Sequence, residues 1–354
     1  MSRVYPAFAR LPAGIGSGPP RGPAREKAVM EEEKPWALIS EVDGWGYPEE
    51  VTDIMNQHFQ IICFREFLKS PLLHGPKIQV MFVWNGFPAV EPSLLSSLPS
   101  LKVVANGGVG IDHLDVRYIT SLGVKVTNTP SVVSDATADI AMGLLLASAR
   151  RIVEGHQTAV NPQTTSPLHH LMGVEVTGST LGIVGMGHIG SKIAQRSKGF
   201  DMKILYHNRN RRSVKDEQAV GASYCEKVDD LLKESDFVML AVNLTPETTG
   251  LISHRELSLM KPTATLVNIS RGQVVDNDAL VKALQSGTIR AAALDVTYPE
   301  PLPRGHPLLG LPNVLITPHV GTNTVATIRR MVQRMVENAL AAVRGQPVPN
   351  EVKS

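Results

Sequence analysis

The sequence predicts an α/β protein made of two doubly wound parallel-sheet domains. Short runs of β-branched residues alternate with helical segments along most of the chain. Its 354 residues are enough for two domains with separate cores. The composition, 43% hydrophobic and 19% charged, is ordinary for a globular protein and excludes a fibre or a disordered chain.

Charge and cysteine content exclude several classes of function. The net charge of +2 gives no reason to expect nucleic-acid or membrane partners. No apolar run reaches the roughly 18 residues that a transmembrane helix needs. Cys63 and Cys225 form neither a disulfide framework nor a metal-binding spacing. We therefore expect a cytoplasmic protein in a reducing compartment, without a metal site.

Residues 1–35 are predicted to be a disordered tail. More than half of segment 11–24 is glycine or proline, so it cannot bury enough apolar surface to order itself. Residues 1–25 contain arginines and no acid, as transit peptides do, but the glycines and prolines oppose an amphipathic helix. The folded sequence is expected to begin after Met30.

The first α/β unit is expected between Trp36 and about Pro130. "WALISEV" favours a strand and "YPEEVTDIMNQH" an amphipathic helix. Further strands are predicted at "IICF", "QVMFVW", "KVVANG" and "GVKVTN". A helix follows over 134–151, where Ser134 is placed to cap its start and the mostly apolar faces predict burial.

The second unit is expected to begin near residue 178. Its strands are predicted at "TLGIVG", "MKILYH", "FVMLAV", "ATLVNIS", "AAALDV" and "NVLIT". Segment 324–345 is predicted to be a long helix that Gly345 ends. Its apolar residues share one face at helical spacing, which favours a core role for them: Ile328, Met331, Val332, Met335, Val336 and Leu340.

A glycine-rich turn in the second unit has the spacing of a phosphate-binding loop. Gly185, Gly187 and Gly190 follow an apolar strand, and a helical segment that includes His188 and Ile189 comes next. Gly185 would make the tight turn, Gly187 would admit a pyrophosphate, and Gly190 would let helix and strand pack closely. The alternative, a glycine-rich turn without a ligand, is less favoured because of the flanking elements.

The next strand ends in "ILYHNRNRR", where a dinucleotide-binding fold often carries an acid for the ribose hydroxyls. No acid is present, and Arg209 lies 24 residues beyond Gly185. An arginine there can pair with the 2′-phosphate of NADPH, and Asn208 can add an amide donor. Arg212 is a possible outer contact, as is Arg211. A solvated basic loop remains the alternative.

Three motifs downstream place polar residues after predicted strands. They are "NISRGQVVD", "LDVTYPEPLP" and "ITPHVG", and they contain Arg271, Glu300 and His319. Strand carboxyl ends are where an open α/β sheet binds its ligands. Singly each residue has an ordinary surface interpretation, but together they predict an active site.

The sequence resembles the D-isomer-specific 2-hydroxyacid dehydrogenase family, and within it the glyoxylate and hydroxypyruvate reductases. The resemblance covers about residues 36–348 and also includes "GVGIDHLDV" and "NLTPETTGLI" in the right order. It implies a Rossmann-type nucleotide domain, residues 132–318, inserted into a flavodoxin-like substrate domain. The substrate domain would combine residues 36–131 with 319–354. A cleft between the nucleotide domain and the substrate domain would hold the active site.

The resemblance also implies roles for individual residues. Arg271 would bind the substrate carboxylate and polarise the keto oxygen. His319 would donate the proton in reduction, and Glu300 would orient it. Backbone N–H groups of Val109 and Gly110 would bind the carboxylate; we interpret the neighbouring Asp112 and His113 as structural. Positions implied near the cofactor are Thr137, Asn243, Ile269, Asp295 and Gly321.

The family comparison leaves some choices open. Reductases of the animal type carry pocket tryptophans before the phosphate loop, whereas segment 161–173 has none and places His169 or His170 there. A longer substrate such as 2-ketogluconate is therefore an alternative. Phosphoglycerate dehydrogenase and formate dehydrogenase fit less well. A dinucleotide-sensing corepressor is a third hypothesis. The resemblance also implies a homodimer built around the nucleotide domain.

Overall fold

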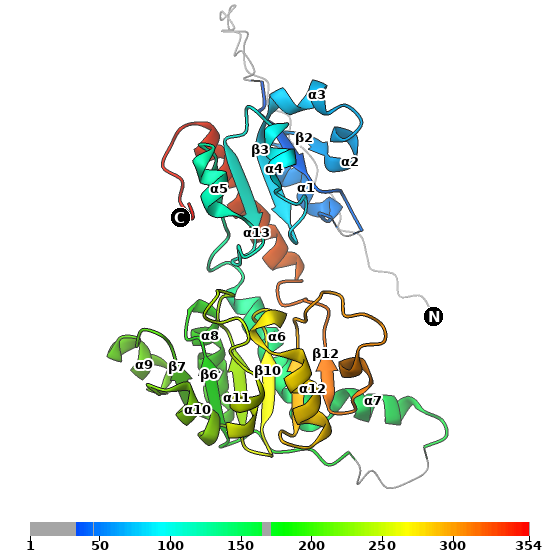
Figure 1. Ribbon diagram of the computed structural model, residues 1–354, viewed down its shortest axis with the longest axis vertical. Coiled ribbons are helices and arrows are strands. Elements are labelled where there is room, and N and C mark those ends of the chain that lie inside the picture. The colour runs from blue at the N-terminus through cyan, green and yellow to red at the C-terminus, as the bar shows by residue number, and fades with distance from the viewer. Residues whose placement is uncertain (1–32, 45, 165–170, 354) are drawn as a thin grey trace, which may run out of the picture. The chain divides into compact units, whose positions relative to one another are not determined.

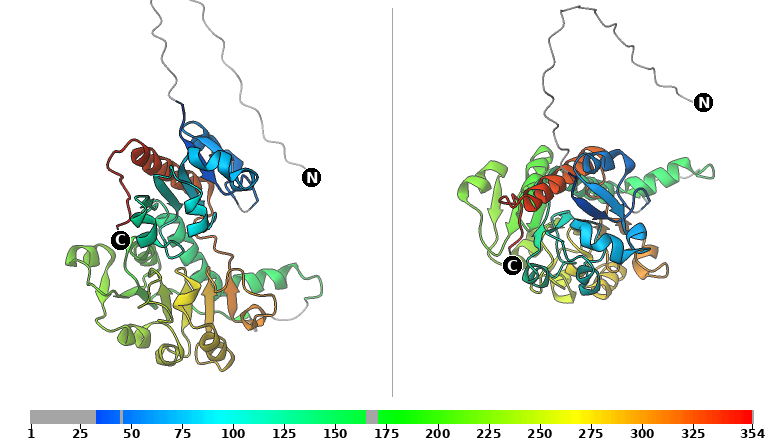
Figure 2. Two further views of the ribbon diagram at one scale, coloured as in Figure 1. Left: turned by 45° about the horizontal axis from the view of Figure 1, so that its top comes forward. Right: turned by 90° about the horizontal axis from the view of Figure 1, so that it is seen from above.

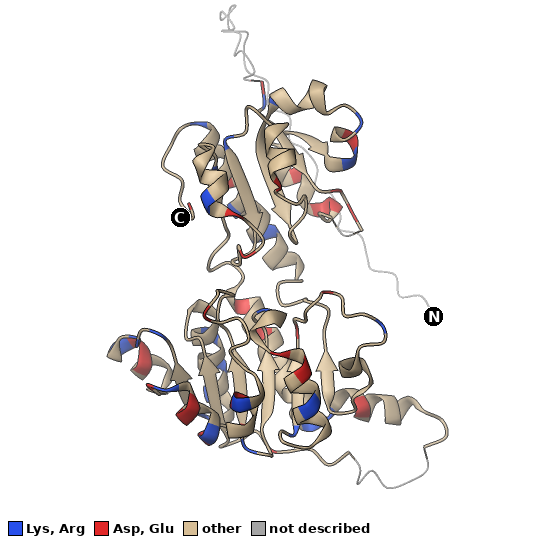
Figure 3. Ribbon diagram, viewed as in Figure 1, with Lys and Arg blue, Asp and Glu red and all other residues tan. Residues whose placement is uncertain are grey.

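The computed structural model describes residues 33–44, 46–164 and 171–353. Residues 34–354 form one compact unit. Most of the expected tail, Met30, His169 and His170 lie outside the described residues. Basic and acidic residues are interspersed over the helices (Figure 3). Within the described ranges, no helix combines the length and the apolar character needed to cross a membrane.

The first sheet has five parallel strands in the order β2-β1-β3-β4-β5, which is the flavodoxin-like order (Figure 1). The strands are β1 (Trp36–Ile39), β2 (Gln60–Cys63), β3 (Ile78–Trp84), β4 (Val103–Gly107) and β5 (Lys125–Thr127). The helices are α1 (Glu49–Asn56), α2 (Phe64–Phe67), α3 (Pro71–His74), α4 (Pro92–Ser96) and α5 (Val116–Ser121), with the 3₁₀ turn η1 (Gly75–Lys77).

The second sheet has seven parallel strands in the order β12-β11-β10-β9-β6-β7-β8. They are β6 (Thr180–Val184), β7 (Lys203–His207), β8 (Ala222–Tyr224), β9 (Phe237–Leu240), β10 (Thr265–Asn268), β11 (Ala291–Leu294) and β12 (Val314–Ile316). The order reverses between β9 and β6, as in a Rossmann fold with one added strand. The doubly wound fold predicted from the sequence is confirmed.

Helices cover both faces of the second sheet. They are α6 (Ser134–Arg150), α7 (Ile152–Val160), α8 (His188–Ser197), α9 (Val214–Val220), α10 (Val228–Glu234), α11 (His254–Leu259) and α12 (Asn277–Gln285), with 3₁₀ turns η3 (Lys198–Phe200), η4 (Gly272–Val274) and η5 (Pro307–Gly310). Alternate residues of β9 enter opposite cores: Val238 packs with α10–α12, and Met239 packs with α6 and α8. This period of two is what a sheet buried on both faces requires.

The last helix, α13 (Val325–Val343), returns to the first sheet and packs on β4, β3 and α1. Figure 2 shows it beside these strands. Met331 and Met335 are buried against Phe82 and Met55, which confirms their core role. The helix ends before Gly345, whose φ of +67° suits glycine. The exact domain limits at 131/132 and 318/319 stay a prediction.

The structure corrects one local prediction and adds elements that the sequence analysis did not name. Ser134 does not cap α6: it is the first helical residue, and its buried Oγ has no hydrogen-bond partner among the described residues. A turn at 130–133 leads into the helix instead, and the N–H of Ser134 bonds to the carbonyl of Ser131. Among the added elements are α7 and the three-residue strand β8.

Candidate active site

Six of the predicted site positions lie at one edge of the second sheet, because its strands are parallel and their carboxyl ends meet there. The positions are Gly185 after β6, Asn208 after β7, Asn243 after β9, Arg271 after β10, Glu300 after β11 and His319 after β12. Residues from six separate segments of the sequence thus converge through the topology of one sheet.

The turn between β6 and α8 is shaped for a bound phosphate. Gly185 has a φ of +105°, and a side chain there would collide with the carbonyl of Ala241. Gly190 packs so closely on the carbonyl of Gly185 that no larger residue fits. A Cβ on Gly187 would meet nothing within 4 Å, so the approach to the N-terminus of α8 is open. These residues fit the pyrophosphate of a dinucleotide.

The loop after β7 displays an exposed arginine outside any salt bridge. Arg209 makes no hydrogen bond or salt bridge to the described residues, and its charge contributes to lowering the pKa of Glu247, whereas Arg211 pairs with Glu217 and Arg212 with Asp216. The Oδ1 of Asn208 accepts the N–H of Met186 at 2.6 Å and so ties this loop to the phosphate loop. Its amide nitrogen stays available as a donor.

The guanidinium of Arg271 is held in a fixed orientation. Its Nε donates to Asp112 at 3.0 Å, and its Nη1 donates to the carbonyl of Ser270 at 2.8 Å. Its Nη2 lies against Gly110, where any side chain would collide with it. Asp112, interpreted from sequence as purely structural, therefore contacts the candidate catalytic residue, and no local pattern could reveal a pair separated by 159 positions.

Buried amide groups shape the loop that faces Arg271. Asn106, 1% exposed, donates to the carbonyl of Gly110 at 2.9 Å, and Asn128 donates to the carbonyl of Val109 at 2.9 Å. The N–H groups of Val109 and Gly110 have no partner among the described residues. Two backbone donors thus remain free beside a guanidinium, an arrangement suited to a carboxylate.

His113 also belongs to this loop, and its Nε2 lies 2.9 Å from Oδ1 of Asn106. Burial lowers the pKa of His113; the charge of Asp112 opposes this shift and that of Arg271 adds to it. A neutral imidazole bonded to a buried amide supports a structural role for His113.

His319 and Glu300 form the pair that the sequence predicts, with Nδ1 of the imidazole 2.9 Å from Oε2 of the carboxylate. Burial raises the pKa of Glu300, but the hydrogen bond and charge of His319, the N–H of Thr297 and the charge of Arg271 outweigh it and lower the pKa overall. The carboxylate is therefore ionised at neutral pH. The influence of Arg271 shows that all three residues share one electrostatic environment.

Asp295 holds the loop that carries His319. Its Oδ1 accepts from Thr317 at 2.6 Å and from the N–H of Val320 at 2.9 Å, and its Oδ2 accepts the N–H of Gly321 at 2.9 Å. His319 itself has a φ of +55°. The cofactor contacts expected of Asp295 and Gly321 stay a prediction; what the structure shows is an anchor for this loop.

The remaining cofactor positions differ in accessibility. Asn243 is exposed, and the preceding N–H of Val242 bonds to Oγ of Ser270 at 3.0 Å. Thr137 and Ile269 are each 7% exposed, and Oγ1 of Thr137 donates to the carbonyl of Val133. Their cofactor roles also stay predictions.

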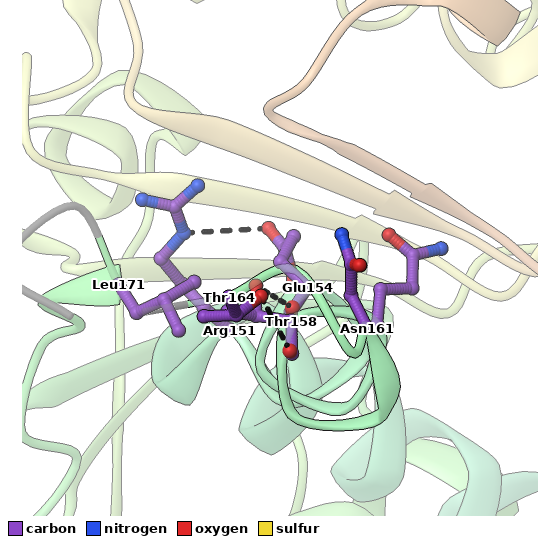
Figure 4. A pocket seen from close by; sticks show the side chains of 7 residues that line it. Arg151, Glu154, Thr158, Asn161, Thr164 and Leu171 are labelled. Carbon is purple, nitrogen blue, oxygen red and sulfur yellow. Dashed lines mark hydrogen bonds and ion pairs between the residues drawn. The ribbon is translucent and has the colours of Figure 1, made fainter. Parts of the chain in front are cut away.

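A separate cavity of about 350 Å³ lies along α7 (Figure 4). It is lined by Arg151, Glu154, Gln157, Thr158, Asn161, Thr164 and Leu171. None of the strand-end residues contributes to it, so we do not place the active site there.

The described residues contain no cluster of three or more His, Cys, Asp or Glu side chains able to hold a metal ion.

Comparison with known proteins agrees with this geometry. Residues 142–321 match the model of the D-isomer specific 2-hydroxyacid dehydrogenase, NAD binding domain. The chain is 41% identical to a glyoxylate reductase from Thermococcus gammatolerans, covering 86% of this chain and 93% of the relative. For a glyoxylate reductase from Korarchaeum cryptofilum the identity is 45%, with 86% and 93% covered.

A solved structure of similar fold is an NADPH-dependent glyoxylate/hydroxypyruvate reductase from Sinorhizobium meliloti, in complex with NADP and malonate. It is 29% identical with a TM-score of 0.78, over 91% of this chain and 97% of that one. The strand-end site, the glycine loop and these matches lead to one conclusion. The chain belongs to the D-isomer specific 2-hydroxyacid dehydrogenase family.

Proposed function

We propose that this protein reduces small 2-keto acids, with glyoxylate and hydroxypyruvate as substrates and NADPH as cofactor. One observation carries the proposal: the N–H groups of Val109 and Gly110 have no partner among the described residues, and Gly110 lies directly against the oriented guanidinium of Arg271. Such a site recognises a carboxylate, which every 2-keto acid has. Three similar proteins from different organisms are named as glyoxylate or glyoxylate/hydroxypyruvate reductases, which supports the substrate class.

In this proposal the chain binds the substrate through its carboxylate. The free backbone donors and Arg271 hold the two oxygens, and the guanidinium polarises the adjacent keto group. Asp112 and the carbonyl of Ser270 fix the plane of the guanidinium, so little orientation has to be acquired on binding.

His319 supplies the proton. Because its Nδ1 faces Glu300, the second ring nitrogen, Nε2, carries the proton that passes to the keto oxygen. The ionised Glu300 stabilises the protonated imidazole until transfer. When bound, the reduced dinucleotide supplies the hydride.

The preference for NADPH rests on Arg209. It is exposed at the end of β7 and makes no salt bridge in the described chain, although its charge reaches Glu247, and Asn208 beside it keeps a free amide. A carboxylate at this place would repel a 2′-phosphate, whereas a guanidinium attracts it. The similar structure from Sinorhizobium meliloti is named as NADPH-dependent.

The test is a comparison of initial rates with NADPH and NADH across glyoxylate, hydroxypyruvate, pyruvate and 2-ketogluconate. We expect the two small acids to give the highest kcat/KM, and NADPH to be preferred. A higher kcat/KM with 2-ketogluconate would favour the longer substrate. Absence of turnover with every keto acid would refute the reductase proposal and favour a dinucleotide-sensing role.

We also propose that two copies associate through α7. This helix packs mainly on α6 and leaves large apolar side chains exposed: Ile152 56%, Val153 39%, Val160 63% and, beyond the helix, Met172 76%. Such a surface is costly in water and is typical of an interface.

A cytoplasmic location, also proposed, agrees with two free cysteines.

Light scattering after size-exclusion chromatography is expected to give twice the chain mass of 38.3 kDa. Ile152→Asp combined with Val160→Asp should give the monomer mass, because a buried unpaired charge opposes association. Leu72→Asp, at a 94% exposed apolar residue of α3, is the matched control and should stay dimeric. A monomeric unmodified protein would contradict the proposal.

A further inference from the structure

The side chains behind the loop 208–212 form a network that the proposed mechanism does not use. Arg211 makes a bidentate pair with Glu217 of α9, with Nε to Oε1 at 2.8 Å and Nη2 to Oε2 at 2.9 Å. Oε1 also accepts from the hydroxyl of Tyr206 at 2.6 Å. Figure 3 shows acidic residues on α9 next to basic ones.

This network differs from surface ion pairs because its acid and its phenol are buried. The side chain of Glu217 is 9% exposed, and Tyr206 is fully buried. Hydrogen bonds from Arg211 and Tyr206 lower the pKa of Glu217 to about 2, against the effect of burial. The carboxylate is therefore ionised at every pH used for enzyme assays, and the network persists under those conditions.

The network fixes the backbone of the loop as well as one side chain. The hydroxyl of Tyr206 accepts the N–H of Arg212 at 3.0 Å, and the hydroxyl of Tyr224 donates to the carbonyl of Asn208 at 3.2 Å. The guanidinium of Arg211 lies 5.5 Å from the ring centre of Tyr224. Both ends of the loop are thus held. Residues 209 and 210 at its tip make no hydrogen bond to the described residues, and the charge of Arg209 reaches Glu247.

We propose that Tyr206, Glu217 and Arg211 are positioning residues that set cofactor choice by holding Arg209 toward the 2′-phosphate. This inference rests on the proposed NADPH preference. It assigns different roles to two arginines of one short segment. Arg211 forms the ion pair with Glu217, and Arg209 contacts the ligand. Because the backbone is held on both sides of Arg209, less freedom of the loop is lost when its guanidinium binds the phosphate.

The experiment measures KM and Kd for NADPH and for NADH in the full-length protein. Arg209→Ala should raise the NADPH values about 10- to 100-fold and the NADH values less than about 2-fold, the loss expected for one charge-assisted contact. Glu217→Gln and Tyr206→Phe should raise the NADPH values about 3- to 10-fold with the same selectivity, because Arg209 remains but is less well held.

Two further variants make the result specific. Asp216→Asn removes the acid paired with Arg212, where both side chains are more than 40% exposed, and should leave both cofactors unchanged. In Arg209→Ala/Glu217→Gln the NADPH loss should equal that of Arg209→Ala alone, because the network acts through Arg209.

Each outcome decides between the two proposals. Selective loss in Arg209→Ala without selective loss in the Tyr206 and Glu217 variants overturns the positioning role and keeps the NADPH proposal. No selective loss in Arg209→Ala overturns the NADPH proposal and, with it, positioning through Arg209. Equal losses for both cofactors in the Glu217 and Tyr206 variants would show that the network only stabilises the fold. A melting temperature measured for each variant identifies that case.

Discussion

Arg271→Lys is expected to lower kcat/KM for glyoxylate about 100-fold. Lysine keeps the positive charge but loses the planar fork of donors. Each charge-assisted hydrogen bond lost with the fork costs roughly 1.5–3 kcal/mol. All three guanidinium nitrogens have a neighbour: Nε donates to Asp112, Nη1 donates to the carbonyl of Ser270, and Nη2 lies beside Gly110. An ammonium group cannot make these contacts together. Steady-state kinetics with glyoxylate at saturating NADPH measure the effect.

The same variant should bind NADPH as well as the unmodified enzyme, since Arg271 contacts none of the phosphate-loop residues in the structure. Arg304→Lys, at an exposed loop residue, is the matched control and should leave kcat/KM unchanged. A loss of NADPH affinity equal to the loss of kcat/KM would mean that Arg271 maintains the site as a whole.

His319→Asn is expected to lower kcat about 1,000-fold, the typical contribution of a general acid. Asparagine is the informative replacement because residue 319 has a φ of +55°, a conformation that asparagine tolerates better than alanine. The fold and the anchor to Asp295 should therefore survive while the proton donor is lost. An unchanged melting temperature checks this, and retention of full kcat would refute the acid role.

Glu300→Gln separates orientation of the imidazole from its charge. The pKa of Glu300 is lowered, so the carboxylate is ionised at assay pH and stabilises the protonated imidazole. A neutral amide accepts the hydrogen bond but gives no such stabilisation. Reduction should then be slower than in the unmodified enzyme wherever Glu300 is ionised, and the difference should shrink as the pH falls through the lowered pKa of Glu300, where the carboxyl of the unmodified enzyme also becomes neutral. A uniform loss at all pH values would indicate orientation alone.

The sequence predicts the strand-end residues well because the signal is local. A strand followed by a polar residue puts that residue at the carboxyl edge, and parallel strands share that edge. Gly185 and Gly190 are similar cases, since the tight turn and close packing expected of them are what the backbone shows. The short strand β8 was not predicted, because three residues with a serine between them carry no clear alternation.

The sequence could not show which charged side chains pair. The spacing from Gly185 favours Arg209 over Arg211 and Arg212, but only the position of Glu217 on α9 shows that Arg211 is already paired. Asp112 and Arg271 come from different sheets, so their contact follows from topology. The cap assigned to Ser134 was wrong for a related reason: the preceding turn, closed by the carbonyl of Ser131, already uses the N–H of Ser134.

The return of α13 to the first sheet has a consequence for how the chain is made. One face of that sheet is completed by residues 325–343, so ribosome-bound chains that end before them expose Phe82, Val80 and Ala105 where the helix would lie. All strands of the second sheet come from residues 180–316, so this sheet needs no later segment of the chain to complete its strand order. The first sheet is therefore synthesised before the helix that covers one of its faces, and that apolar face stays without its native cover until residues 325–343 have been made.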